Sequence, residues 1–489
     1  MSLINRLGKS SVIYTSTTIL QNGIAFLLLP LYTRYLTPND YGILAVVSSI
    51  NGFLTIFLML SLHGAMTRFY FDYRNEPEKL KAFWGTILTF ILIFSMGVGG
   101  LLILSGPILF KPVIAEISFW PFVALGIGAV MFQPFFTIYL SLLQTREQAR
   151  KYAVFSFLQF LMNLALVITL VVFVGWGAEG PLAAALMTAV VFFIISIYAL
   201  RDNVVFGMNK IYLKEALRYS LPLVPHSLAS QISNATGKLF LNYLVNTGSA
   251  GLYNIAFMFG SIIGVVSDGI NKAYVPISMG ILSTNRREEV EHLKDIVLFL
   301  VVMYCLLGTM ISLFSKEAIF ILTTEAFYRS YVIVPFLAFY FVLGGIYYIL
   351  VNILFFVKKA TKFVAVGTGI GAVSNILLSW LMIPRYGLFG AAAATLLAQM
   401  IGTLFVGVIG RGFEIIHWEY KKFVFIFIFS AMCSFFFVRL EDLTLWASLS
   451  AKMAAFVSLF FLLNFVAWRD PFFLLSHGKK IFFEIVKKE

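Results

Sequence analysis

Long apolar runs recur along the whole chain, and short polar segments separate them. Runs of about eighteen residues or more are long enough to cross a bilayer as α-helices. The runs are continuous rather than alternating, which excludes the strands of a membrane barrel. We therefore predict an all-α polytopic membrane protein with fourteen transmembrane helices, at residues 11–33, 43–66, 83–104, 117–143, 152–174, 181–200, 219–245, 251–278, 295–314, 331–357, 363–383, 388–410, 423–438 and 446–467.

Basic residues are distributed unevenly between the predicted loops. One set of alternate segments holds 27 of the 36 Lys and Arg residues, the other set holds six, and Lys238, Lys272 and Lys452 fall inside spans. Because cytoplasmic loops are enriched in Lys and Arg, this ratio predicts that both termini are cytoplasmic. It also accounts for the net charge of +13 without nucleic acid as a partner.

The loops and the composition exclude several classes of enzyme. Only 12% of the residues are charged, against about 25% in soluble proteins, and no loop leaves room for an extramembrane catalytic domain. No Walker-type loop, HExxH motif or Cys/His cluster is present, so we predict no ATP site, metal or cofactor. Cys305 and Cys433 lie in predicted spans, where we interpret them as packing residues.

Similar segments return after about 210 residues and predict an internal repeat. Each repeat has six spans, an even number, so the two copies run parallel and form two six-helix lobes facing each other. This gives an N-terminal lobe at 1–205, a C-terminal lobe at 206–412, and two extra transmembrane helices with a cytoplasmic tail at 413–489. The matching segments are 149–152 with 360–363, 177–184 with 387–394, and 35–42 with 243–253.

The hairpin from Tyr219 to Met279 carries most of the charges that we place within the membrane, namely Lys238, Asp268 and Lys272. Ions in hydrocarbon are costly and usually face a water-filled cavity on a substrate or ion path. Lys238 is interpreted either as a cation that contacts an anionic cargo or as a side chain that snorkels to the outer interface. Asp268 and Lys272 are spaced i,i+4 and are expected to interact, either as a structural pair or as a pair that opens during transport.

Two arginines at span ends complete the set of candidate binding residues. Arg34 is placed at the outer end of the first span, where snorkelling competes with contact to the cargo. Arg68 is placed at the cytoplasmic end of the second span. It acts either as a topology signal alone or as a receptor for an anion at the entrance. Asp268 is the candidate for coupling to an ion gradient, because burial and the nearby Lys272 have opposite effects on its proton affinity.

Residues 30–42 read PLYTRYLTPNDYG, and a second segment runs from Gln144 through Tyr152 to Asn163 and the turn at Gly177 and Gly180. With the six plus six plus two arrangement, these segments resemble the polysaccharide transporter family of the multidrug/oligosaccharidyl-lipid/polysaccharide flippase superfamily. The likeness is greatest to flippases of O-antigen and related repeat units. It covers about residues 10–470, although its motifs are loose.

The resemblance implies a transporter in the bacterial inner membrane and not an enzyme. Its cargo would be an undecaprenyl-diphosphate-linked oligosaccharide, moved to the periplasmic leaflet by alternating access for O-antigen, capsule or exopolysaccharide synthesis. The implied partners are membrane lipids, H⁺ or Na⁺, and other polysaccharide-assembly membrane proteins. A cationic lumen, here Lys238, Lys272, Arg34 and Arg68, would suit the diphosphate. The alternatives are a multidrug/cation antiporter of the same superfamily and a membrane enzyme of polysaccharide assembly.

Overall fold

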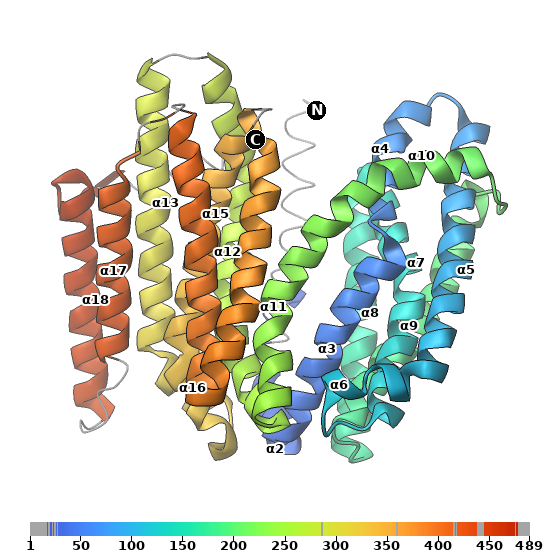
Figure 1. The fold of residues 1–489 in the computed structure, drawn as a ribbon, viewed down its shortest axis with the longest axis horizontal. Helices are drawn as coiled ribbons and strands as arrows, with labels where there is room; N and C mark the ends of the chain where they lie inside the picture. Colours follow the sequence, from blue (N-terminus) through green and yellow to red (C-terminus); the bar gives the residue numbers. More distant parts are fainter. Residues whose placement is uncertain are drawn as a thin grey trace. The chain divides into compact units, whose positions relative to one another are not determined.

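A computed structural model of the chain describes residues 28–284, 287–357, 360–413, 418–437, 445–474 and 476–477, together with residues 17, 20, 21, 23, 26 and 416. The described part is helical and contains no strand (Figure 1). This confirms the all-α prediction for these residues. The chain divides into two compact units, residues 1–251 and 252–489.

In unit 1 the longer elements form a bundle around the buried faces of α4, α5, α7 and α9. The helices of unit 1 are α2 (Leu29–Tyr35), α3 (Pro38–Met59), α4 (Leu62–Tyr73), α5 (Pro77–Leu109), α6 (Lys111–Ile114), α7 (Ala124–Thr145), α8 (Ala149–Ile168), α9 (Glu179–Leu200), α10 (Lys210–Ser220) and α11 (Val224–Leu244). Short π and 3₁₀ turns lie at Phe119–Val123, Thr169–Phe173, Arg201–Asn203 and Leu221–Leu223.

Unit 2 is organised around α13, which packs against α15, α17 and α18. Its helices are α12 (Thr247–Thr284), which begins in unit 1, and α13 (Arg287–Leu313), α14 (Ser315–Leu322), α15 (Val334–Phe356), α16 (Thr361–Gly412), α17 (Tyr420–Phe437) and α18 (Leu445–Trp468), with a 3₁₀ segment at Glu325–Ile333. Cys305 is fully buried in this core, and neither cysteine is in a disulfide.

Eleven helices in the described residues are long and apolar enough to cross a membrane. Three differences separate this number from the fourteen predicted spans. The span at 11–33 lies largely outside the described residues. The span at 219–245 contains the helix α11, which is too polar to be counted. The spans at 363–383 and 388–410 are joined in α16 across a break at Gly387, where φ is +53°. Fourteen spans and the two-lobe repeat therefore stay predictions.

The segment that carries the family resemblance builds a junction between three helices. Thr37 and Asp40 form a capping box that begins α3. The second carboxylate oxygen of Asp40 accepts a hydrogen bond from the backbone N–H of Ala178, 3.2 Å away. Asp40 thus also fixes the start of α9, next to the glycine turn at Gly177.

The starts of α3 and α12 cross with no side chain between them. A Cβ on Gly42 would lie 1.8 Å from the carbonyl oxygen of Thr247, and one on Gly251 would lie 2.0 Å from that of Pro38. The contact is reciprocal: the first residue of each helix touches the glycine one turn into the other. The two residues of α12 follow those of α3 by the same 209 positions, as an internal repeat predicts.

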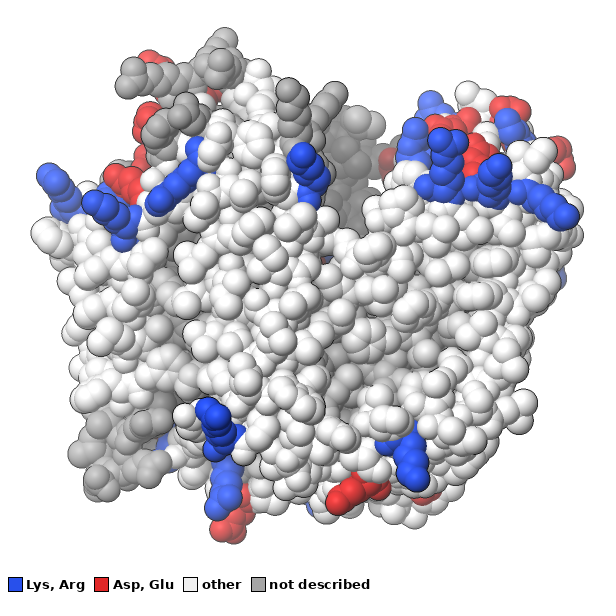
Figure 2. All heavy atoms as spheres, in the orientation of Figure 1, with Lys and Arg blue, Asp and Glu red and all other residues white. Residues whose placement is uncertain are grey.

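Charged side chains are confined to the helix ends in the visible face of each unit. Figure 2 shows basic and acidic groups toward both ends of the helices, with an uncharged surface between them. An uncharged band between two polar rims is the surface that a bilayer requires, because unpaired charges in hydrocarbon are costly. The few ionic groups that lie within the helices are therefore candidates for function.

The crossing of α3 and α12 predicts an unequal response to one substitution at two glycines of α12. Gly251→Ala is expected to cost about 1–3 kcal/mol or more, because its Cβ overlaps a backbone carbonyl that cannot rotate away. Gly280→Ala is the matched control, since nothing lies within 4 Å of its Cβ position. Thermal melting in detergent should show a lower Tm for the first variant and no decrease for the second. Equal melting of the two variants would contradict the tight crossing.

Candidate functional site

Asp268 and Lys272 form the ion pair that their spacing predicts. Lys272 Nζ lies 3.0 Å from Asp268 Oδ2 on α12, a helix long and apolar enough to cross a membrane. Both side chains are exposed, at 73% for Lys272 and 54% for Asp268. An exposed pair within such a helix is open to a ligand or to water, because its polar atoms are not enclosed by other side chains.

Two residues of α15 extend this polar patch, and the sequence analysis did not identify them. Asn352 Nδ2 donates a 2.6 Å hydrogen bond to Asn271 Oδ1, beside the ion pair. Tyr348, one turn before Asn352, is 41% exposed and close enough to interact electrostatically with Asp268. No local spacing relates these residues to α12, so only the fold brings them together. The exposed part of the patch offers a cation, a carboxylate and a hydroxyl, while the amide of Asn352 is buried and bonded to Asn271.

Lys238 lies half-buried on α11 in unit 1. It shares one side of the helix with Gln231 and Asn234, at intervals of three and four residues. That polar side faces α3, since Gln231 Nε2 donates to the carbonyl oxygen of Ser49 at 3.1 Å. The polar stripe explains why α11 is less apolar than the other long helices. Anion contact and snorkelling both stay open for Lys238.

The end of α11 is held by a second polar residue one turn beyond Lys238. Asn242 is buried and donates hydrogen bonds to the carbonyl oxygens of Val113 and Ile114, at 3.3 and 3.1 Å. Its own Oδ1 accepts a 2.9 Å hydrogen bond from the hydroxyl of Thr247. This network joins α11, α6 and the start of α12, so the side chain of Lys238 extends from a well-anchored helix.

Arg34 and Arg68 are not parts of one site. Arg34 is exposed in the last turn of α2, just before α3, whereas Arg68 lies on α4, just after α3. The 22 residues of α3 separate them by about 33 Å. Arg68 is already paired, with its Nη1 2.6 Å from Asp72 Oδ1 in an exposed i,i+4 contact. The two arginines therefore lie toward opposite ends of the helix bundle in unit 1.

A buried ion pair in unit 2 was missed by the sequence analysis. Lys452 Nζ on α18 lies 2.5 Å from Glu317 Oε1 on α14, and the two side chains are 0% and 14% exposed. Lys452 was placed within the last span without a partner, and Glu317 was placed in a loop. Glu317 Oε2 is buried and has no hydrogen-bond partner among the described residues. The pair ties the last helix to the rest of unit 2.

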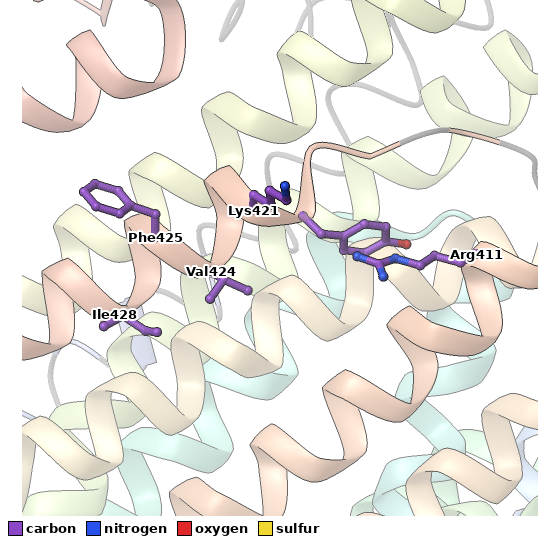
Figure 3. A pocket seen from close by; sticks show the side chains of 6 residues that line it. Arg411, Lys421, Val424, Phe425 and Ile428 are labelled. Atoms are coloured by element: carbon purple, nitrogen blue, oxygen red, sulfur yellow. The ribbon is translucent and has the colours of Figure 1, made fainter.

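A shallow groove lies where the end of α16 meets the start of α17 (Figure 3). Arg411 and Lys421 are at its basic end, and Val424, Phe425 and Ile428 line its apolar wall. The Arg411 guanidinium stacks 4.1 Å from the centre of the Tyr420 ring. None of the predicted site residues lines this groove. Within the described residues, no group of three or more His, Cys, Asp or Glu side chains is arranged to hold a metal ion.

Comparison with known proteins places these features in a family. Residues 7–282 match the polysaccharide biosynthesis protein family, which is more than half of the chain. The chain therefore belongs to this family, and the predicted resemblance is confirmed.

Two proteins of Haemophilus influenzae are related to a little more than half of the chain. Lsg locus putative protein 1 is 24% identical over 277 residues, 55% of this chain. An uncharacterized membrane protein is 27% identical over 283 residues, 56% of this chain. The matches span 65% of each of these curated relatives.

Solved structures show that the fold is that of known membrane transporters. The lipid II flippase MurJ, in an inward closed conformation, matches with a TM-score of 0.69 at 16% identity, covering 93% of this chain and 98% of that chain. An inward-facing multidrug resistance MATE family transporter of the MOP superfamily matches with a TM-score of 0.59 at 15% identity, covering 81% and 94%. The chain thus has the fold shared by these two groups.

The two intrahelical lysines of unit 2 are expected to affect stability differently. Lys452→Met leaves Glu317 buried and uncompensated, which costs about 3–5 kcal/mol, and should lower Tm in detergent strongly. Lys272→Met breaks an exposed pair and should change Tm little. The double variant Lys452→Met with Glu317→Gln should recover most of the loss, because no buried charge remains. Equal Tm values for the two single variants would contradict the assigned burial.

Proposed function

We propose that the protein is a flippase for a lipid-linked oligosaccharide. The cargo is an undecaprenyl-diphosphate-linked repeat unit, which moves from the cytoplasmic to the periplasmic leaflet of the bacterial inner membrane. Membership of the polysaccharide biosynthesis family supports the glycan, and the likeness of fold to a lipid II flippase supports flipping. O-antigen, capsule and exopolysaccharide units all have this chemistry.

The observation that carries the proposal is the exposed Lys272 within the membrane-length helix α12. A diphosphate with its glycan needs a polar passage, while the lipid tail can stay in hydrocarbon. In the proposal, Lys272 on α12 and Lys238 on α11 each act as a contact for the diphosphate along its path. Arg68 receives it near the cytoplasmic end, and Arg34 contacts it near the outer end. The exposed hydroxyl of Tyr348 suits the hydroxyl groups of sugars.

The fold alone also suits a multidrug/cation antiporter. A cation site favours a carboxylate that is free of basic partners, whereas Asp268 is paired with Lys272. An enzyme of polysaccharide assembly is less well supported, since the described loops between helices are short. Two lysines, Lys238 and Lys272, stand against the one carboxylate of Asp268 in the segment from Tyr219 to Met279, and this excess of basic groups favours an anionic cargo over a cationic one.

Substitution of Lys238 tests the anionic cargo in cells. Lys238→Ala should reduce surface glycan strongly in a strain that lacks the chromosomal copy, because the lost group contacts the diphosphate. Lys238→Arg keeps the charge and should retain more glycan. Immunoblots of membranes should show similar protein levels for both variants. Full glycan display by Lys238→Ala would indicate that this lysine only snorkels to the interface.

We further propose that Asp268 couples transport to a gradient of H⁺ or Na⁺. In one conformation of the protein it is paired with Lys272, and in another it exchanges a proton or Na⁺ with water. Asp268→Asn keeps the shape and removes the charge change. In proteoliposomes this variant should still bind lipid-linked glycan but lose its response to an imposed gradient. A normal response would show that coupling lies elsewhere and that the pair is structural.

A further inference from the structure

The short helix α10 connects α9 to α11 and is fixed to unit 1 along one side. Asn209 caps its start by accepting hydrogen bonds from two backbone N–H groups. Ala216 and Ser220 are buried, and the helix lies against α4 and α5 (Figure 1). Glu215 Oε2 accepts a 2.8 Å hydrogen bond from the hydroxyl of Tyr73, at the end of α4. The orientation of α10 about its own axis is therefore determined.

The opposite side of α10 carries a row of three cations that the structure leaves unneutralised. Lys210, Lys214 and Arg218 are exposed and follow each other at intervals of four residues. None of them has a carboxylate within 4.0 Å among the described residues. Figure 2 shows the basic groups that gather at this end of unit 1.

Neighbouring cations at the same end of unit 1 behave differently. Lys79, Lys81 and Arg201 each lie within 4 Å of a carboxylate, at 3.6, 3.8 and 3.7 Å respectively. Their charge is therefore balanced within the protein. The row on α10 has no such balancing carboxylate among the described residues.

Exposed apolar side chains precede the row in sequence, follow it and, at Ile211, lie within it. They are Val205, Phe206, Met208, Ile211, Tyr219, Leu221 and Leu223. Exposed apolar groups beside a row of cations are the pattern of a helix that lies in the membrane interface. Its apolar groups reach the acyl boundary and its cations reach the headgroups. If only water surrounded these apolar side chains, the hydrophobic effect would favour their burial.

We propose that residues 205–223 bind the anionic lipid headgroups of the surrounding leaflet, through Lys210, Lys214 and Arg218. Eight residues of helix separate the first cation from the last, which is about 12 Å. A row of lipid phosphates can meet all three cations at once, each in its extended form. Bound lipid holds α10 at the interface and with it the start of α11, the helix that carries Lys238. This inference does not depend on the cargo.

Hydrogen–deuterium exchange of the full-length protein in nanodiscs tests this site locally. In phosphatidylglycerol discs, amides of residues 205–223 should exchange more slowly than in phosphatidylcholine discs. The expected factor is roughly fivefold, which is about the effect of one engaged cation. The difference should disappear in the triple variant Lys210→Gln, Lys214→Gln, Arg218→Gln. It should persist in the matched control Lys79→Gln, Lys81→Gln, Arg201→Gln, which removes the same charge from paired positions.

Two further exchange measurements, at raised salt and with added pyrophosphate, test whether lipid headgroups are the bound anions. Raised salt should weaken the protection of wild-type α10, because surface charges are screened, and this arm needs no variant. Inorganic pyrophosphate added to phosphatidylcholine discs should not reproduce the protection. Equal exchange in the two lipids, an unchanged difference in the triple variant, or full protection by pyrophosphate would each overturn the assignment to lipid headgroups.

Discussion

The crossing of α3 and α12 is the contact on which the described architecture depends. Gly42 and Gly251 let two backbones touch where any side chain would collide with a carbonyl group. The contact joins the capping-box junction at Asp40 to the first turn of α12. Beyond Gly251 the same helix enters unit 2 and carries the ion pair of Asp268 and Lys272. The helix α12 thus starts in unit 1 and carries its ion pair in unit 2.

The chain keeps charged side chains within its helices in three different ways. Lys452 and Glu317 are enclosed and paired, which makes them part of the fold. Asp268 and Lys272 are paired but exposed, so that breaking the pair costs the fold little. Lys238 is half-buried on the polar side of a helix anchored by Gln231 and Asn242. Only the last two arrangements leave an ionic group able to meet a cargo.

Features that depend on local spacing could be predicted from the sequence. The apolar runs predicted a helical membrane protein, and the i,i+4 interval predicted the contact of Asp268 with Lys272. The capping box at Thr37 follows from its own residues, and the segment around it indicated the family. The similar segments are about 210 residues apart, and the same spacing relates the residues of the helix crossing. Gly251 follows Gly42, and Thr247 follows Pro38, by 209 positions.

Features that depend on distant segments could not be predicted. Glu317 and Lys452 are 135 residues apart, and Asn271 and Asn352 are 81 apart, so no periodicity relates them. Glu317 lies between two predicted spans, on the short helix α14. The pattern of apolar runs does not show that the chain folds back there and brings Glu317 against α18. The polar stripe of α11 lowers its hydropathy below that of an ordinary span, although tertiary contacts with α3 support it. Such contacts become visible only in the folded chain.

An assay with purified protein tests directly whether the protein flips a lipid-linked oligosaccharide. The full-length protein would be reconstituted in vesicles that contain an undecaprenyl-diphosphate-linked oligosaccharide, and a glycan-cleaving enzyme added outside would report how much of the cargo is accessible. In protein-free vesicles with the cargo equally distributed between the leaflets, about half of it is accessible. If the protein flips the cargo, the accessible fraction should rise above this half. Transport of a small cationic dye in the same vesicles, with no movement of the lipid-linked glycan, would contradict it.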